Sequence, residues 1–429
     1  MRVSVIAALT LLPAVLVLIG TRIEHFRIFR VPGDDLSNHG FWATLSRWVM
    51  QRPVLVLIPT LAILLLLGEP FRHANISSPD ATILPKTTES RQGYDQLVAA
   101  FGPGEISPMV LAFESPSSIY DPANIAAIRS VIRQLEADPR VARVEGFGAL
   151  GADVTDQQAV GLINLQRLAA ENGIGSRFSQ FANDNTALAL VYLHAYPNDP
   201  ESKDVLADIR AMPVGGDVTL LVDGGTAEIV DVVNEMYGDF PLAIAIVVIA
   251  TYLILFILFN SVLLPIKAIL MNTLSLFASY GALVWIFQDG HLTGPLRFDP
   301  QGYVEASLPI IMFCILFGLS MDYEVFLLSR IREEWDKTHD NTEAVAVGLQ
   351  RSGRIITSAA LIVVVVTISF ISADVILVKA LGFGIALAVF LDATIVRALL
   401  VPATMRLLGD ANWWVPGFLR RSHNPFADL

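Results

Sequence analysis

The sequence predicts an α-helical polytopic membrane protein that carries one extracytoplasmic α/β domain. Hydrophobic residues make up 54% of the 429 residues, and the mean hydropathy of +0.57 is typical of proteins that cross a membrane several times. Long apolar segments recur along the chain, and a spanning helix needs about 20 such residues. One polar block, residues 69–238, interrupts them and mixes helix-type with strand-type patterns.

Seven apolar segments are long enough, or nearly so, to span a bilayer, so we expect about seven transmembrane helices. They cover residues 4–19, 53–68, 240–260, 263–287, 307–329, 355–372 and 380–408. The expected organisation is a transmembrane helix in 1–20, a cytoplasmic loop in 21–52, a helix in 53–68, the α/β domain in 69–238, a five-helix bundle in 239–408 and a cytoplasmic or interfacial tail in 409–429.

Basic residues in the short loops predict the orientation, because Lys and Arg concentrate on the cytoplasmic side. The loop 21–52 carries five arginines, and the segment 330–354 carries four arginines and one lysine. The loops 288–306 and 373–379 carry one basic residue each. We therefore expect a multi-pass protein of the plasma membrane, with the block 69–238 outside the cytoplasm.

An internal echo indicates a repeat. Residues 11–20 (LLPAVLVLIG) resemble residues 400–409 (LVPATMRLLG), both with a Pro-Ala step and a closing glycine. Internal repeats are common in transporters. The first segment then looks like the last helix of a preceding, missing half. A signal peptide is the alternative, but Pro13 within the run, the lack of a cleavage site and the basic loop that follows oppose it.

The polar block alternates helical and strand patterns. Helices are expected over 88–101, 121–137 and 202–211, and strands over 108–114, 141–144, 188–194 and 218–222. This alternation favours an α/β sandwich of the split β-α-β type. The run 154–186 is the least clear part and is compatible with an inserted helical piece.

Charge and motifs exclude several classes of function. The block 69–238 holds 11 Lys and Arg against 23 Asp and Glu, so the net charge of −12 belongs to it and speaks against nucleic acid as a partner. The single cysteine, Cys314, cannot form an internal disulfide, and no spacing of residues predicts a metal site. Gly224-Gly225 lacks any nucleotide-binding pattern around it. We expect no cofactor and no enzymatic activity.

The strongest functional signal is Asp322, which lies within the apolar run 307–328. A carboxyl group at mid-helix in hydrocarbon costs roughly 2.5–3.5 kcal/mol, and such residues usually mark ion paths or proton relays. Gly318 precedes Asp322 by four residues on the same face, and a face of small residues lets another helix approach closely. Desolvation there would favour the neutral acid, as a reversible proton carrier requires. The alternative is a buried acid held permanently by an arginine.

Other side chains could complete a relay. Tyr323 points about 100° away from Asp322, towards a neighbouring helix. Asp392 and Arg397 are five residues apart, which predicts that each pairs across helices, in a relay or in a purely structural ion-pair network. Thr357 and Ser358 could donate hydrogen bonds to the same cluster. Glu324 is expected near the interface and partly solvated.

Several motifs resemble those of the MMPL transporters, within the resistance-nodulation-division (RND) superfamily. The resemblance covers essentially the whole chain. It rests on Phe317–Glu334 (FGLSMDYEVFLLSRIREE), Leu84–Lys86, Ser90–Tyr94, Phe101–Gly104, Gly353–Ala360 and Trp413-Trp414.

The resemblance implies an RND-type half-transporter that exports lipids or other hydrophobic molecules with protons as the counter-ion. It assigns proton coupling to Asp322 and Tyr323, and makes the outside domain a porter domain. Family members usually have two halves, so a homo-oligomer or a separately encoded N-terminal half is expected as partner, beside membrane lipids. The rival hypotheses are a non-transporting lipid-sensing or scaffold subunit, or an inactive remnant of a split transporter gene.

Overall fold

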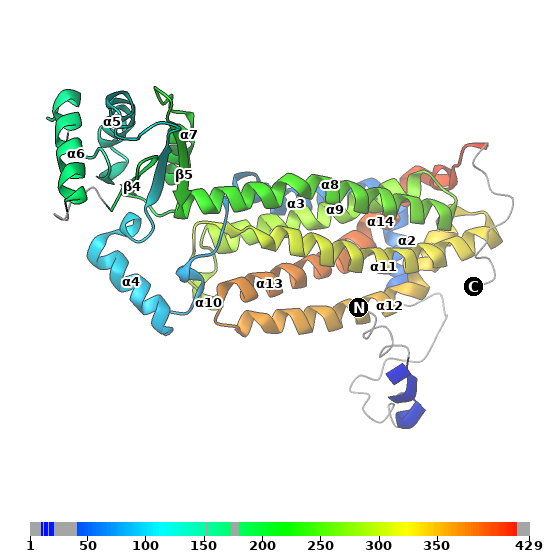
Figure 1. The fold of residues 1–429 in the computed structure, drawn as a ribbon. Coiled ribbons are helices and arrows are strands. Elements are labelled where there is room, and N and C mark those ends of the chain that lie inside the picture. The colour runs from blue at the N-terminus through cyan, green and yellow to red at the C-terminus, as the bar shows by residue number, and fades with distance from the viewer. Residues whose placement is uncertain are drawn as a thin grey trace.

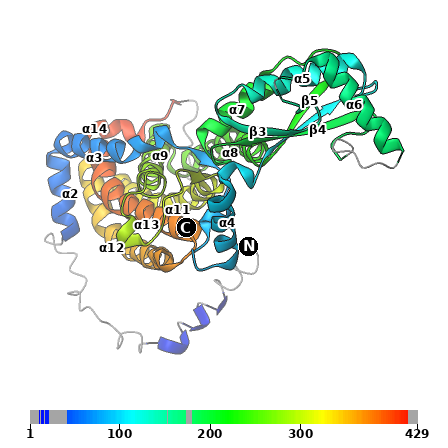
Figure 2. The same ribbon diagram turned by 90° about the vertical axis from the view of Figure 1, so that its left-hand side faces the viewer.

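The computed structural model describes residues 41–151, 153–172 and 180–417, together with short pieces between 10 and 20. A long helical bundle carries an α/β domain at one end (Figure 1). Figure 2 shows that this domain projects to one side of the bundle.

Six helices of the described residues are long and apolar enough to cross a membrane. They are Pro53–His73, Gly225–Phe259, Leu263–Gln288, Ser307–Thr338, Asn341–Ser372 and Ile376–Trp413. A polytopic membrane protein is therefore confirmed. Half of the expected first span, 4–19, lies outside the described residues, so the seventh helix stays a prediction.

The bundle contains both regular and distorted helices. Its α-helices are α3 (Pro53–Gly68), α8 (Gly225–Phe259), α9 (Leu263–Leu283), α11 (Ser307–Thr338), α12 (Asn341–Ile368), α13 (Ile376–Leu391) and α14 (Val401–Leu408). The π-helical segments η5 (Val284–Gln288) and η7 (Asp392–Leu400) extend α9 and join α13 to α14. The 3₁₀ segments η2 (Glu69–His73), η6 (Ser369–Ser372) and η8 (Gly409–Trp413) extend three of the spans.

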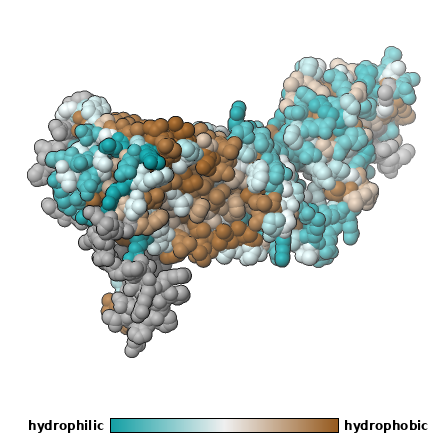
Figure 3. Space-filling model, turned by 180° about the vertical axis from the view of Figure 1, so that it is seen from behind, coloured by the Kyte–Doolittle hydropathy of each residue, from teal (hydrophilic) through white to brown (hydrophobic). Residues whose placement is uncertain are grey.

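The surface of the bundle agrees with a membrane location. Figure 3 shows a hydrophobic band around its middle and hydrophilic residues at both ends. Several large apolar side chains of α8 are exposed, including Leu242, Ile246, Ile249 and Leu253. Apolar surface of this extent is expected where lipid replaces water.

The end of the bundle opposite the α/β domain is built from polar caps and an additional helix (Figure 1). His339 takes a left-handed conformation with φ 52° and ends α11, and the Asp340 side chain accepts from the backbone N–H groups of Thr342 and Glu343 to start α12. Part of the expected loop 21–52 is a helix, α2 (Phe41–Gln51), which packs against α12. Residues 21–40 lie outside the described residues.

The α/β domain has a four-stranded antiparallel sheet in the order β3-β4-β2-β5. Its strands are β2 (Met109–Glu114), β3 (Val141–Gly146), β4 (Thr186–Leu193) and β5 (Thr219–Gly224), and its helices are α5 (Pro122–Glu136), α6 (Asp156–Glu171) and α7 (Pro200–Ala211). Strand β4 lies between β2 and β3, and β2 lies between β4 and β5. The expected split β-α-β topology therefore occurs twice, interleaved. The unclear run 154–186 contains α6.

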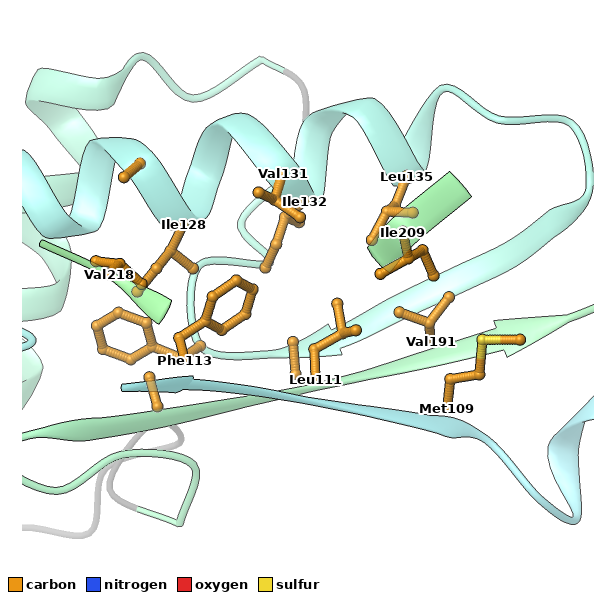
Figure 4. Packing of buried hydrophobic residues seen from close by; sticks show 14 of the residues in the cluster. Met109, Leu111, Phe113, Ile128, Val131, Ile132, Leu135, Val191, Ile209 and Val218 are labelled. Carbon is orange, nitrogen blue, oxygen red and sulfur yellow. The ribbon is translucent and has the colours of Figure 1, made fainter. Parts of the chain in front are cut away.

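The core of this domain forms between the sheet and its helices. Figure 4 shows Ile128, Ile132 and Leu135 of α5 pointing towards Leu111 and Phe113 of β2. All five side chains are fully buried. Each buried side chain of this size contributes about 1.5–3 kcal/mol, so this apolar cluster holds the domain together without a disulfide.

Short elements connect the domain to the bundle. Strand β1 (Ile76–Ser77), just after η2, pairs in parallel with β6 (Val304–Glu305), just before α11. The 3₁₀ turns η3 (Ala81–Ile83) and η4 (Pro103–Glu105) flank α4 (Glu89–Phe101), and α10 (Thr293–Leu296) lies between α9 and α11. Helix α8 begins directly after β5 and is one helix of 35 residues, with Pro241 in its interior. A tilt of α8 would therefore move the sheet.

Candidate functional site

A polar cluster lies within the apolar bundle where α11 meets η7. The Asp392 Oδ2 accepts from Arg397 Nη2 at 2.6 Å and from the Ser320 hydroxyl at 2.9 Å. Arg397 Nη2 also donates to the Ser320 carbonyl oxygen at 2.6 Å. Arg397 is 1% exposed and Asp392 7%. A buried ion pair with shared hydrogen bonds is the arrangement that tolerates such desolvation.

The prediction that Asp392 and Arg397 pair across helices is wrong, because they pair with each other. The reason is the π-helical segment η7, which begins at Asp392 and includes Arg397. Hydrogen bonds in a π-helix run from residue i to i+5, so residues five apart lie one above the other. Such segments occur frequently at functional sites.

Tyr323 joins this cluster from the next turn of α11. The Arg397 guanidinium carbon lies 5.0 Å from the centre of the Tyr323 ring, within the range of a cation–π contact. Tyr323 also lines a small cavity together with Ser320 and Asp392. As expected, it reaches a neighbouring segment and not Asp322.

Asp322 lies on a different face of α11, which no other described helix covers. Its side chain is exposed, and so are Ile311, Cys314, Ile315 and Gly318 at three- and four-residue spacing. A Cβ added to Gly318 would meet no atom within 4 Å. The expected close helix approach at Gly318 is therefore absent among the described residues, and the face remains uncovered.

Thr357 and Ser358 do not belong to the cluster. The Thr357 hydroxyl donates to the carbonyl oxygen of Gly353 at 2.8 Å, and the Ser358 hydroxyl donates to that of Arg354 at 2.8 Å. Hydroxyls within helices commonly bond back to the preceding turn in this way. The expectation that they donate to the Asp322 or Asp392 region is wrong.

Glu324 is buried, contrary to the expectation of a solvated position. It is 4% exposed and faces Lys267 of α9, with 3.8 Å between the Lys267 Nζ and the Glu324 Oε1. Asp322 and Glu324 are two residues apart, so they point about 200° apart around the helix. Helix α11 thus carries one acid on its uncovered face and another on its packed face.

Sequence reasoning missed four polar residues of this region. Ser320 bonds Asp392, while Lys267, Asn272 and Ser275 of α9 are all buried. Lys267 is an isolated cation within the apolar run 263–287, and a charge in a spanning helix could have indicated a buried partner. Asn272 and Ser275 gave only a weak one, because polar residues in spanning helices are common at helix contacts.

The described residues contain no group of three or more His, Cys, Asp or Glu side chains that could hold a metal ion. The charged groups of the cluster instead form one cation–anion pair beside a tyrosine and a serine. Such an arrangement can hold, orient or pass a proton. The fold and these residues define the class: a polytopic membrane protein with charged groups buried at mid-bundle and an α/β domain at one end of the bundle (Figure 1).

Comparison with known proteins identifies the family. The model of the MMPL family matches residues 82–425, so the chain belongs to the MMPL family. Similar proteins include the membrane protein SCO6666 of Streptomyces coelicolor, 35% identical over 99% of this chain, and the trehalose monomycolate exporter MmpL3 of Mycobacterium tuberculosis, 33% identical over 97%. The membrane protein YdfJ of Bacillus subtilis is 30% identical over 97%. The chain is thus a multi-pass protein of the plasma membrane.

The chain spans about half the length of the curated relatives it matches. It covers 53% of SCO6666, 44% of MmpL3 and 52% of YdfJ. A further relative is named a heme uptake protein, MmpL11 of M. tuberculosis, 33% identical over 88% of this chain. The relatives thus include a trehalose monomycolate exporter and a heme uptake protein.

Proposed function

We propose that this chain supplies one half of a transporter that exports lipids or other hydrophobic molecules and takes up protons in exchange. The observation that carries the proposal is Asp322, an acid at mid-helix on a face of α11 that is otherwise apolar and small. An acid facing hydrocarbon costs roughly 2.5–3.5 kcal/mol, so a position of this kind calls for a functional reason. The names of MmpL3 and MmpL11 support hydrophobic cargo.

In this mechanism Asp322 binds a proton from the outside and releases it to the cytoplasm. The neutral acid is compatible with an apolar neighbour, whereas the carboxylate needs water or a cation. Each change of charge therefore changes how the uncovered face of α11 packs. Tyr323, next in the sequence, couples that face to the Arg397–Asp392 pair through its ring.

Helix α8 is the element that would carry the movement to the outside domain. It leaves β5 at Gly225 and continues to Phe259 without a break. The Arg210 guanidinium of α7 makes two hydrogen bonds of 2.7 Å to the carboxylate of Asp231 on α8. This contact joins α7 to the first turns of α8, and α8 follows β5 without a linker, so the domain and the start of the helix would move together.

A second half is required to cover the Asp322 face. It is another copy of this chain, a separately encoded protein or further residues of a longer chain. A second half packed on this face would give Asp322 polar or hydrated surroundings. It would also bring a helix close to Gly318, where the missing side chain leaves room for such a contact.

Asp322→Asn tests the proposal. Reconstituted vesicles containing the protein, with any partner that purifies with it, would be loaded with a pH-sensitive dye and given a pH gradient. We expect Asp322→Asn to abolish proton flux, because the amide cannot titrate, and Cys314→Ser on the same face to retain it. Unchanged flux in correctly inserted Asp322→Asn would contradict the relay and favour a non-transporting scaffold.

A further inference from the structure

The interface between α9, α11 and η7 contains most of the unsatisfied buried polar atoms of the described residues. In the described part of the chain, seven buried side-chain N and O atoms lack a hydrogen-bond partner. Six of them belong to residues of α9, α11 and η7. They are Lys267 Nζ, Asn272 Nδ2, Ser275 Oγ, Glu324 Oε1, Arg397 Nε and Arg397 Nη1. A buried unpaired polar group costs about 1–3 kcal/mol, so a cluster of them requires a missing partner.

Three of these residues belong to α9. Asn272 and Ser275 are three residues apart and share one helix face, whereas Lys267 lies five residues before Asn272 and about 140° around the helix from it. All three are 5% exposed or less. With a rise of about 1.5 Å per residue, these three residues extend over about 12 Å of the length of α9. On α11, Ser320 and Glu324 are four residues apart, are both buried and share the packed face.

A small cavity lies between α9, α11 and the Asp392 end of η7. Asn272, Ser275, Ser320, Tyr323 and Asp392 supply its polar lining, and apolar side chains complete it. It leaves about 10 Å³ for the centre of a water molecule, which is room for about one water. The unpaired Asn272 Nδ2 and Ser275 Oγ belong to its wall, so a water there would find the several polar partners it needs.

The Lys267–Glu324 pair lies further along α9 and α11, beyond Asn272 and Ser320. At 3.8 Å the two charged groups are too far apart for a hydrogen bond, yet within ion-pair distance. A buried ion pair is stable only when hydrogen bonds satisfy its remaining donors and acceptors, and neither the Lys267 Nζ nor the Glu324 Oε1 has one. A bridging water would provide them.

We propose that ordered waters occupy this interface, from the cavity beside Asp392 to the Lys267–Glu324 pair, and that they form the cytoplasmic exit of the proton path. The inference rests on the proposed proton coupling and extends it to the packed face of α11. A proton that reaches the cavity water is passed along the waters to the Glu324 carboxylate. Glu324 then releases the same proton towards the cytoplasm and returns to its charged form beside Lys267.

The charged and titratable groups around this interface are few. Lys267 comes from α9, Tyr323 and Glu324 from α11, and Asp392 and Arg397 from η7. Helix α3 has no charged residue, and the part of α8 within the bundle has only Tyr252, which stacks on Phe256. The charges of the other neighbouring helices lie elsewhere: Lys379 of α13 bonds Leu296, while Arg354 of α12 and Asp410 of η8 are exposed.

The first measurement tests the waters on the purified chain in nanodiscs. Infrared difference spectra between acidic and neutral pH would be recorded in ordinary and in ¹⁸O-labelled water. We expect water bands that shift with ¹⁸O and that disappear in the double variant Asn272→Leu, Ser275→Ala. Ser279→Ala is the matched control, because Ser279 is equally buried, lies one turn further and bonds the Ser275 carbonyl oxygen. Water bands that persist in a folded double variant would overturn the proposal.

The second measurement tests the route in the vesicle assay for proton flux. We expect the double variant and Glu324→Gln to lower flux to the level of empty vesicles, with Ser279→Ala and Glu343→Gln near the native rate. If Asp322→Asn blocks flux but Glu324→Gln and the double variant do not, the exit path is wrong and the proposed function stands. If Asp322→Asn leaves flux unchanged, the proposed function fails instead.

Discussion

At the scale of single residues, the Asp392–Arg397 pair is the most demanding feature of the bundle. Both side chains are buried, and Arg397 has two nitrogen atoms without hydrogen-bond partners. The pair is held by Ser320 and by the ring of Tyr323. Replacing one partner of this pair should therefore destabilise the protein more than replacing both partners.

Asp392→Asn should destabilise the protein by about 3–5 kcal/mol, because it leaves the Arg397 charge buried without its counter-ion. The double variant Asp392→Asn, Arg397→Met should recover part of that loss. Thermal unfolding of the purified protein in detergent measures both. Asp336→Asn, which breaks an exposed pair with Arg332, is the control and should change stability by less than about 1 kcal/mol. A double variant less stable than Asp392→Asn would contradict this account.

Asp138 is predicted to make the α/β domain sensitive to acid. The Arg140 side chain and backbone N–H donate to Asp138 and hold the pKa of its carboxyl below the usual value. A depressed folded-state pKa gives stability that is present above the unfolded pKa, about 3.9, and is lost as the pH falls through the folded pKa. Hydrogen exchange of β3 amides should be faster in Asp138→Asn than in the native chain at neutral pH, and the difference should vanish in strong acid. An equal difference at all pH values would exclude this pair as the cause.

At the scale of elements, glycines decide which helices approach closely. A Cβ at Gly281 of α9 would lie 2.1 Å from the Leu67 carbonyl oxygen of α3, whereas one at Gly318 of α11 would meet nothing within 4 Å. Gly281 therefore permits a close contact between two helices of this chain, whereas Gly318 lies on an uncovered helix face. Backbone atoms on both sides of the Gly281 contact cannot rotate away.

Gly281→Ala should destabilise the bundle by about 1–3 kcal/mol, because α3 and α9 must separate to admit the methyl group. Gly318→Ala is the matched control and should leave the stability of the isolated chain unchanged. Thermal unfolding in detergent compares the two. Equal stability of the two variants would mean that α3 and α9 are less tightly packed than the structure indicates.

At the scale of the whole molecule, the uncovered face of α11 should be the surface that binds the second half. Cys314 lies on that face and is exposed, so labelling of this native cysteine shows whether the face is covered, and no cysteine needs to be introduced. A maleimide that enters membranes should modify Cys314 rapidly in the isolated chain and slowly in the assembled protein. Gly318→Leu should restore rapid labelling and shift the native mass towards the single chain. Equal labelling rates in both states would place the second half elsewhere.

The amount of structure that was predictable from sequence differs between the fold and the site. Apolar length was enough to locate the six spans in the described residues, although helices such as α8 and α12 extend well beyond their apolar runs. They extend because a helix satisfies its own backbone hydrogen bonds in water as well as in lipid. The site was harder to predict. Asp322 was evident as an acid within an apolar run, but the predicted hydrogen bonds from Thr357 and Ser358 to its region are not formed.

The sequence by itself determined that this is a polytopic membrane protein with one acidic polar block, residues 69–238, and an acid within the helix α11. Hydropathy and charge are sums over the residues of a segment, so they can be calculated without knowing which residues are in contact in the folded protein. Only the tertiary structure decided that Asp392 pairs with Arg397, that Glu324 is buried against Lys267, and that Asp322 faces outward. Periodicity tells which residues share a helix face, but packing decides what that face meets, and the π-helical η7 alters the rotation that a regular helix would have given.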